Sequence, residues 1–368
     1  MGFRAPWRQP QRARSDTAPP NQHCDSDPGV AGNASPAYTC IGSGGYGLNL
    51  AIKDSVAAEF AQVDDVIVEL LQSDVELVEN IGHYIVKAGG KRMRPLLVLL
   101  AAKALGGIDD AHIRFAAVVE FIHTATLLHD DVVDLSTLRR GMPTANAEFG
   151  NAPSVLVGDF IYTRAFQLMV GLGNMPLLEH MAETTNTIAA GEVMQLVHAG
   201  DPDTQAEQYQ EIIRRKTAAL FAAACHGAAL LHNTSTAKAD ALHDYGMHLG
   251  IAFQLADDLL DYAGDPEQTG KNVGDDLAEG KITLPLLHAM KVGREADRLF
   301  VADALRKKDG SAFADIMSIV KQTGAIEATR EAALEHQSQA INALDVLGQN
   351  EATVALSEMA SRAVDRRG

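Results

Sequence analysis

Two aspartate-rich segments of the same form stand far apart in this 368-residue chain. Residues 130–134 read DDVVD, and residues 257–261 read DDLLD. In a helix, residues four apart lie on one face with their Cβ atoms about 5–6 Å apart. Carboxylates that share a face repel each other unless a cation lies between them. Mg²⁺ is typically held by one or two carboxylates together with substrate phosphates. The sequence therefore predicts metal ligands at Asp130, Asp134, Asp257 and Asp261.

An acidic pair at this spacing is usually just a solvated helix face. Here the flanks argue against that reading, because residues 121–128 read FIHTATLL and residues 251–256 read IAFQLA. Charges embedded in apolar helices are costly without partners, so a functional site is favoured. Two such segments predict two walls that hold one Mg²⁺–diphosphate group between them.

Composition excludes several classes of partner. The chain has 31 basic and 48 acidic residues, a net charge of −17, which disfavours binding to nucleic acid or to anionic lipid. The three cysteines show no metal-ligand spacing and fit a reducing compartment, so we expect a cytoplasmic protein. No apolar run reaches the roughly 18–20 residues of a membrane span, so no transmembrane segment is expected.

Residues 1–47 differ from the rest of the chain. They are rich in Pro, Gly, Ser and Asn and show little periodicity, which predicts a disordered extension before one domain at 48–368. The start is not followed by the apolar stretch of a secretory signal. Early arginines would suit an organellar transit peptide, but prolines and acidic residues weaken that alternative.

The pattern from residue 48 onward is helical. Apolar residues from Ile52 to Leu71 form a stripe, Pro95 suits a first helical turn, and Gly106 suits a helix end. Capping boxes are expected at Ser73 with Glu76 and at Thr204 with Glu207. Longer helices are predicted at about 110–134, 153–171, 176–199, 205–232, 237–262 and 283–292, followed by four shorter ones. Without strand alternation or a fixed repeat, this indicates an all-α bundle with inward-projecting acidic residues.

Basic residues gather in the segment 89–95, which reads GGKRMRP. Glycines allow close backbone approach, a helix N-terminus favours anions, and arginine and lysine bind phosphate oxygens. Alone, the segment could equally be a solvated cationic turn. Arg139 and Arg140 follow the first aspartate segment closely, and His123 lies two turns before Asp130 on the same face. His129 projects off that face and is interpreted as structural.

Further polar residues interrupt apolar surroundings later in the chain. Lys216 and Thr217 lie within an apolar helix, and Gln254 lies just before the second aspartate segment. Lys271 and Lys281 flank a loop rich in Gly and Asp. The loop 263–282 could close over bound phosphate as a lid, and its Asp275 and Asp276 are given no role.

Together these segments resemble the trans-polyprenyl diphosphate synthases from about residue 50 to the C-terminus. The matching motifs are GGKRMRP, HTATLLHDDVVD, LRRG, GDFIYTRAF, GEVMQL, RKTAALF, FQLADDLLDY, GKNVGDDLAEGK and TLPLL. The motif sequences look most like those of bacterial members that make an eight-isoprene chain for ubiquinone. The resemblance implies an isoprenoid-synthase-type helical bundle with a central cavity, acting as a homodimer. Its substrates would be an allylic diphosphate, here farnesyl diphosphate, and successive isopentenyl diphosphates.

The resemblance also implies residue roles. Asp130, Asp134 and Asp257 would hold Mg²⁺ on the allylic diphosphate and, with Lys216, carry catalysis. Isopentenyl diphosphate would be bound by Lys91, Arg94, His123 and Arg140. The allylic diphosphate would be held by Arg139, Lys216, Thr217, Gln254, Lys271 and Lys281. The extension 1–47 departs from the family, whose bacterial members start near residue 48.

The residues fit this chemistry independently. Cations neutralise a departing pyrophosphate, so that an allylic carbon–oxygen bond can ionise, and a growing chain needs an apolar tunnel. Ala125 and Thr126 stand where an aromatic residue blocks the tunnel in short-chain relatives, which favours a long product. The floor could come from another helix, for example at Phe166 or Met169. The open alternatives are a shorter, nonaprenyl or decaprenyl product, a terpene cyclase, and a non-catalytic subunit.

Overall fold

The computed structural model describes residues 50–365 apart from 88, 140 and 264–273. The expectations for residues 1–47, for Arg140 and Lys271, and for half of the loop 263–282 therefore lie outside the described residues. Within the described part, the chain is almost entirely helical, and its strands form one two-residue hairpin. The all-α class predicted from sequence is confirmed.

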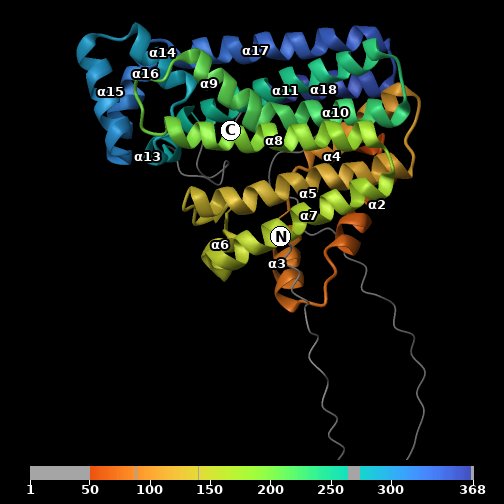
Figure 1. Ribbon diagram of the computed structural model, residues 1–368. Coiled ribbons are helices and arrows are strands. Elements are labelled where there is room, and N and C mark those ends of the chain that lie inside the picture. Colours follow the sequence, from red (N-terminus) through yellow and green to blue (C-terminus); the bar gives the residue numbers. More distant parts are fainter. Residues whose placement is uncertain (1–49, 88, 140, 264–273, 366–368) are drawn as a thin grey trace, which may run out of the picture. The chain divides into compact units, whose positions relative to one another are not determined.

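The first half of the described chain supplies the lower layer in Figure 1 and part of the upper one. Its elements are α1 (Leu50–Asp54), α2 (Ala57–Leu70), α3 (Glu76–Lys87), α4 (Met93–Leu105), α5 (Asp110–Val133), β1 (Leu138–Arg139), β2 (Met142–Pro143), α6 (Ala145–Phe149), α7 (Asn151–Leu172) and α8 (Met175–His198). The hairpin is antiparallel, with Leu138 opposite Pro143.

The second half begins with α9 (Ala206–Ile213), which continues through a π-helical segment, Arg214–Ala218, into α10 (Ala219–His232). We call Arg214–Ala218 the π segment. The remaining helices are α11 (Thr236–Ala263), α13 (Asp275–Glu279), α14 (Leu284–Val292), α15 (Glu295–Lys307), α16 (Phe313–Gln322), α17 (Ala325–Ala343) and α18 (Glu351–Val364). Short 3₁₀ turns lie at Gly310–Ala312 and Leu344–Leu347.

The long helices pack side by side. Figure 1 shows α8, α10, α11 and α17 running in one layer, with α5 and α7 below them. Contacts join α11 to α17 and α10, α10 to α8 and α4, and α5 to α7. Residues from Leu96 to Ala102 are buried on all sides of α4, as expected for an apolar helix inside a bundle. Cys225 is fully buried in α10 as a small core residue.

Helix ends follow the sequence signals in part. Pro95 lies in the first turn of α4, and Gly106 ends that helix with a φ of 132°. Both predicted capping boxes are wrong in their partners. Ser73 N donates to Glu79 rather than Glu76, at 3.1 Å, because Glu76 is itself the first helical residue. Before α9 the pair is Gln205 with Gln208, where the backbone N–H of Gln205 donates at 2.7 Å. The Thr204 hydroxyl donates to the Asp201 carbonyl instead.

Among the helices of the described residues, α5 and α7 are long and apolar enough to cross a membrane by length and composition. In α5, 61% of the apolar window is buried inside the bundle, whereas in α7 only 33% is buried. The absence of a transmembrane segment therefore stays a prediction. The apolar surface left on α7 needs an explanation of its own.

Candidate active site

The two aspartate segments end two long helices, and Lys281 contacts the first of them. Asp130 and Asp134 close α5, while Asp257 and Asp261 lie in the last turns of α11. Lys281 Nζ donates to Asp134 Oδ2 at 2.8 Å and also pairs with Glu279. Burial would lower the pKa of Lys281, but the carboxylates of Asp134, Glu279 and Asp276 outweigh it and raise the pKa. Asp276 also acts on Asp261, so acidic groups from both walls converge on one region.

The first wall is the aspartate segment 130–134, in which the Asp131 carboxylate forms an ion pair with Arg139. Asp131 is 4% exposed and accepts a fork from Arg139, with Nε and Nη2 at 2.7–3.1 Å from its oxygens. This pair ties the β1–β2 hairpin to the end of α5. Arg139, expected to hold the allylic diphosphate, contacts Asp131 in this structure, and its substrate role stays a prediction. Burial raises the pKa of Asp130, Lys216 opposes that rise, and Asp134 adds to it.

The second wall is organised around Asp258, for which no role was predicted. This carboxylate is buried and accepts hydrogen bonds from the Tyr209 hydroxyl and from Gln254 Nε2, the latter at 2.9 Å. Gln254 Oε1 accepts from the Thr217 hydroxyl at 2.9 Å. Burial, reinforced by Asp276, raises the pKa of Asp258 to about 8. Thr217 and Gln254 are therefore brought together as predicted, by a network that continues into the core.

Asp261 provides an observation that bears on metal binding. Its Oδ1 accepts from the Gly274 backbone N–H at 3.1 Å, whereas its buried Oδ2 has no hydrogen-bond partner among the described residues. Burial and the nearby Asp276 raise the pKa of Asp261 to about 7. A buried carboxylate oxygen without a proton donor is costly, and a hard divalent cation removes that cost. Asp261 has the chemistry of a metal ligand, but among the described residues no three Asp, Glu, His or Cys side chains lie close enough together to hold a metal ion in this structure.

Lys216 has two partners that the sequence reasoning missed. Its Nζ donates to Glu192 Oε2 at 2.5 Å and to Gln195 Oε1 at 2.6 Å, and it lies 3.8 Å from Asp130 Oδ2. Burial raises the pKa of Glu192 to about 7 against the opposing effect of Lys216. The signal was present, because both partners belong to the GEVMQL motif, and residues three apart share a helix face.

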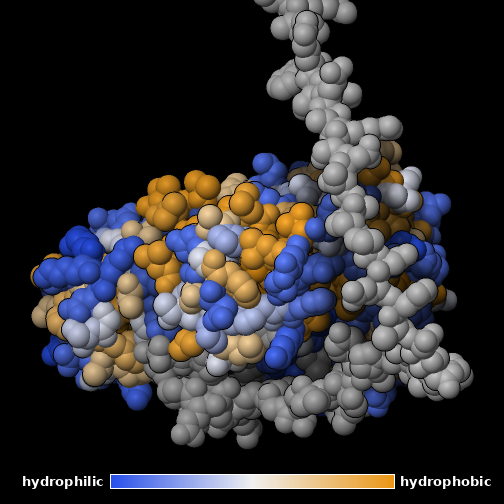
Figure 2. Space-filling model, turned by 90° about the horizontal axis from the view of Figure 1, so that it is seen from below, coloured by the Kyte–Doolittle hydropathy of each residue, from blue (hydrophilic) through white to orange (hydrophobic). Residues whose placement is uncertain are grey.

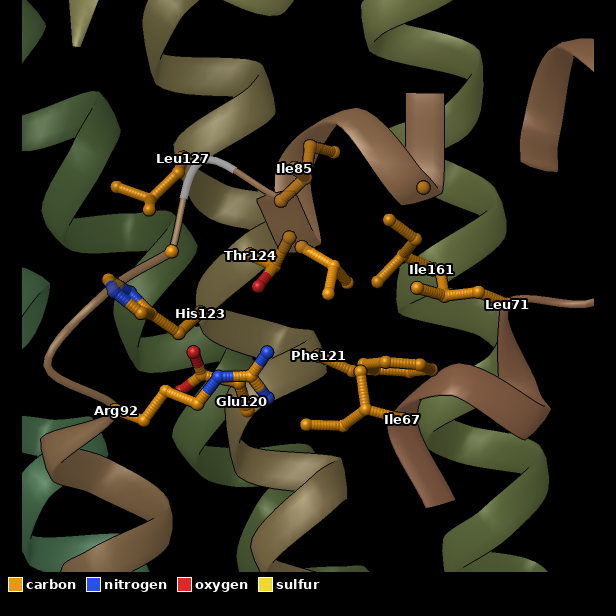
Figure 3. Close-up of a pocket in the computed structure, with 13 residues that line it drawn as sticks. Ile67, Leu71, Ile85, Arg92, Glu120, Phe121, His123, Thr124, Leu127 and Ile161 are labelled. Carbon is orange, nitrogen blue, oxygen red and sulfur yellow. The ribbon is translucent and has the colours of Figure 1, made fainter. Parts of the chain in front are cut away.

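The basic segment 91–94 reaches the bundle at the start of α4. The Arg94 guanidinium lies over the Phe221 ring, 4.4 Å from its centroid. Arg92, which received no role, turns inward with a φ of 44° and pairs with Asp64 at 2.7 Å. Figure 3 shows Arg92, Glu120 and His123 together at one end of a cavity whose other end is apolar, with Ile67 and Phe121. The cavity measures about 50 Å³, which is far too small for a prenyl chain.

Of the other predicted residues, Lys91 and His123 lie near this cavity. His123 lines it directly, and Lys91 stands in the chain between Gly89 and Arg92, which both line it. His129 contacts α7, where its Nε2 lies 3.2 Å from the Val155 carbonyl, in keeping with its structural interpretation. Arg140 and Lys271 fall outside the described residues.

Comparisons with known proteins agree with this geometry. The family model for polyprenyl synthetase matches residues 75–323. The octaprenyl diphosphate synthase of Escherichia coli K12 is 50% identical over 316 residues, covering 86% of this chain and 98% of that protein. That of Haemophilus influenzae is 47% identical over 309 residues, covering 84% and 94%. A solved polyprenyl synthase from Caulobacter crescentus CB15, complexed with calcium and isoprenyl diphosphate, has a TM-score of 0.84 at 44% identity, covering 86% and 98%.

An all-helical bundle with aspartate segments at the ends of two long helices, the first of them beside Lys216 and Lys281, has the fold of the isoprenoid synthases. The chain belongs to the polyprenyl synthetase family. Members of this family are prenyltransferases, which condense an allylic diphosphate with isopentenyl diphosphate.

Proposed function

We propose that this enzyme extends farnesyl diphosphate with successive isopentenyl diphosphates to octaprenyl diphosphate, the precursor of the ubiquinone side chain. The observation that carries the proposal is the intact pair of aspartate walls, with Lys216 and Lys281 beside them, in a chain half identical to an octaprenyl diphosphate synthase. A relative from Rhodobacter capsulatus, 44% identical, is a nonaprenyl diphosphate synthase, so product length is the finer question.

The residues divide the work as follows. Asp130, Asp134, Asp257 and Asp261 would hold Mg²⁺, which when bound supplies charge neutralisation for the leaving diphosphate. Lys216, Thr217, Gln254 and Lys281, together with Lys271 and Arg139, would hold the allylic diphosphate. Because Lys216 and Lys281 carry fixed positive charge beside the leaving group, the allylic carbon–oxygen bond can break with less charge separation.

The second substrate is placed by the basic segment. Lys91, Arg94, His123 and Arg140 would bind the diphosphate of isopentenyl diphosphate, whose double bond attacks the allylic cation. The new carbon–carbon bond forms, and the released pyrophosphate accepts the proton lost from the adjacent carbon. A strong protein base is not required beside a carbocation.

The test is chromatography of dephosphorylated products, after purified protein is incubated with farnesyl and isopentenyl diphosphates and Mg²⁺. A product of eight isoprene units supports the proposal. Nine or ten units would change the product assignment only. No elongation by the pure protein would favour the alternative of a non-catalytic subunit, which would then be tested by adding a second chain.

We further propose that the enzyme is a cytoplasmic homodimer that pairs through α7 and α8. Figure 2 shows hydrophobic side chains gathered on one face of the described part. Large apolar side chains stand exposed along these two helices, and a shallow groove on α7 lies between Tyr162 and Val170. The exposed set comprises Val155, Leu156, Val170, Met175, Val193, Leu196 and Val197. A second copy of the chain would remove this surface from water.

Sedimentation or light scattering of the wild-type protein and of Leu156→Asp tests the pairing. We expect a dimer that dissociates in the variant. Val292→Asp, at an equally exposed position on α14, is the control and should leave the dimer intact. A wild-type monomer, or an undisturbed variant dimer, would contradict this interface.

A further inference from the structure

The GEVMQL motif of α8 has no role in the function described so far, yet two of its side chains contact Lys216. Glu192 and Gln195 accept from the same ammonium group at 2.5 and 2.6 Å. Glu192 and Lys216 keep 28% and 20% of their side-chain surface exposed, so solvent screens the pair only in part. An ammonium has three N–H donors. Two are accepted by α8, which leaves one for an oxygen of a bound diphosphate.

The backbone brings these groups together in a specific way. Gly191 precedes Glu192, and a Cβ at that position would lie 2.7 Å from the Lys216 backbone N and 2.8 Å from Arg215 Cβ. Glycine is therefore needed for α8 and the π segment to approach this closely. π-helical turns are rare and occur frequently at functional sites. The π segment directs Lys216 toward α8 and the next residue, Thr217, toward Gln254 of α11.

We propose that Glu192 is a positioning residue that holds Lys216 in front of the leaving diphosphate. This inference rests on the function proposed above. Lysine carries its charge on a flexible four-carbon stem, so fixing the ammonium in one place costs conformational entropy. If Glu192 orients the side chain in advance, the reaction does not have to supply that entropy. Asp130 Oδ2 lies 3.8 Å from Lys216 Nζ, beyond hydrogen-bond distance. Without Glu192 the ammonium can swing onto Asp130 and pair with a metal ligand instead of the leaving group.

A purely structural tie between α8 and the π segment is the competing explanation. If Glu192 only tied these helices together, its loss would lower stability and would impair substrate binding as much as the chemical step. A positioning residue acts through Lys216, so its loss should be felt when negative charge develops on the leaving diphosphate. The two explanations therefore separate in the turnover number, in the Michaelis constant and in the dependence on Lys216.

The first experiment replaces Glu192 by Gln, which keeps the shape and an acceptor oxygen but removes the charge. We expect kcat for elongation of farnesyl diphosphate to fall on the order of 10-fold or more, while KM changes less than about threefold. Glu192→Asp keeps the charge on a shorter stem and should restore part of kcat. Glu183→Gln, at an exposed position of the same helix, is the matched control and should keep wild-type kcat.

The second experiment repeats Glu192→Gln in a Lys216→Met background. If Glu192 acts through Lys216, the second substitution should lower kcat less than about twofold further. An undiminished further loss, or a wild-type kcat in Glu192→Gln alone, would overturn the proposal. Affinity for farnesyl thiolodiphosphate, an unreactive analogue, should stay within about threefold of wild type, and a large loss of binding would also overturn it. Failure of wild-type elongation would instead refute the proposed function.

Discussion

The middle aspartate of each segment contacts different groups from its neighbours. Asp131 is fixed by the Arg139 fork, and Asp258 by Tyr209 and Gln254. Spacing four residues apart identified the outer aspartates as sharing a helix face, and both pairs lie at the C-terminal ends of long helices, α5 and α11; their role as metal ligands stays a prediction. Spacing could not identify the middle aspartates as anchors, because Arg139 lies 8 residues from Asp131 and Tyr209 lies 49 residues from Asp258 along the chain.

Removing an outer aspartate should abolish most activity while the fold is retained. For Asp130→Ala, Asp134→Ala and Asp257→Ala we expect rate losses on the order of 10²-fold or more, because each removes a ligand that helps neutralise the leaving group. The measurement is steady-state turnover with and without EDTA, alongside circular dichroism. Asp240→Ala, exposed on α11, is the control. Full activity in EDTA would refute the metal role.

Arg139 should contribute more to stability than its predicted substrate role implies. Arg139→Ala leaves the carboxylate of Asp131 buried without its partner, which typically costs about 3–5 kcal/mol. Arg139→Lys keeps the charge but loses the two-pronged hydrogen bond, so its free energy of unfolding should lie between those of the wild type and Arg139→Ala. Urea unfolding of the three proteins measures this. Unchanged stability with impaired allylic-substrate binding would show that Arg139 acts on the substrate and not on the fold.

At the scale of the element, helix positions were predictable and helix irregularities were not. Apolar periodicity predicted α5, α7, α8 and α11 to within about three residues at each end. The region 205–232 was predicted as one helix, but the π segment interrupts it. Apolar periodicity shows which face of a helix is buried. A single π-helical turn adds one residue and shifts that face too little to be detected in the sequence pattern. The nearby signal was chemical, namely Lys216 and Thr217 in an apolar run.

Gly191→Ala should therefore damage the enzyme although alanine favours helices. Ordinarily the change gains up to about 1 kcal/mol in a helix. Here the new methyl would lie 2.7 Å from the Lys216 backbone, so α8 and the π segment must separate. We expect lower thermal stability and lower kcat. Gly171→Ala in α7, where a Cβ meets nothing within 4 Å, should be neutral or stabilising. Equal effects of the two substitutions would contradict the close-approach argument.

The tunnel prediction also belongs to α5. Ala125 is fully buried, whereas Thr126 is half-buried and its hydroxyl donates to the His123 carbonyl. Thr126 lies one turn before Asp130, and helical side chains lean toward the N-terminus, so a ring there should enter the path of the growing tail. Thr126→Phe should shorten the product at a stability cost of about 1–3 kcal/mol. Ala125→Tyr should lower stability more than Thr126→Phe does, because Ala125 is fully buried and has no free space for a ring.

The distribution of dephosphorylated products from Thr126→Phe, with its thermal midpoint, is the measurement. A stably folded variant that still makes the full-length product would show that the tunnel passes elsewhere. Phe166 and Met169 of α7 would then be the next positions to test.

At the scale of the molecule, histidines join the packed helices of the upper layer. His180 of α8 lies 3.3 Å from His226 of α10, ring nitrogen to ring nitrogen, and His243 of α11 stacks edge-on against His226. Burial, then the neighbouring His226 and His243, lowers the pKa of His180 to about 4. The sequence did not reveal this cluster, because its members are separated by 46 and 17 residues and meet only when three helices pack.

This cluster predicts how stability depends on pH. The folded pKa of His180 lies below the ordinary value of about 6.5, so between about pH 6.5 and pH 4 the unfolded chain binds more protons. Stability that is fully present above about pH 6.5 is therefore lost as the pH falls toward 4. The glutamine of His180→Gln cannot gain a proton, so the thermal midpoint of this variant should depend less on pH between pH 7.5 and pH 4.5. His83→Gln, at an exposed position of α3, should keep the wild-type slope. A wild-type slope in His180→Gln would assign the acid sensitivity to other groups.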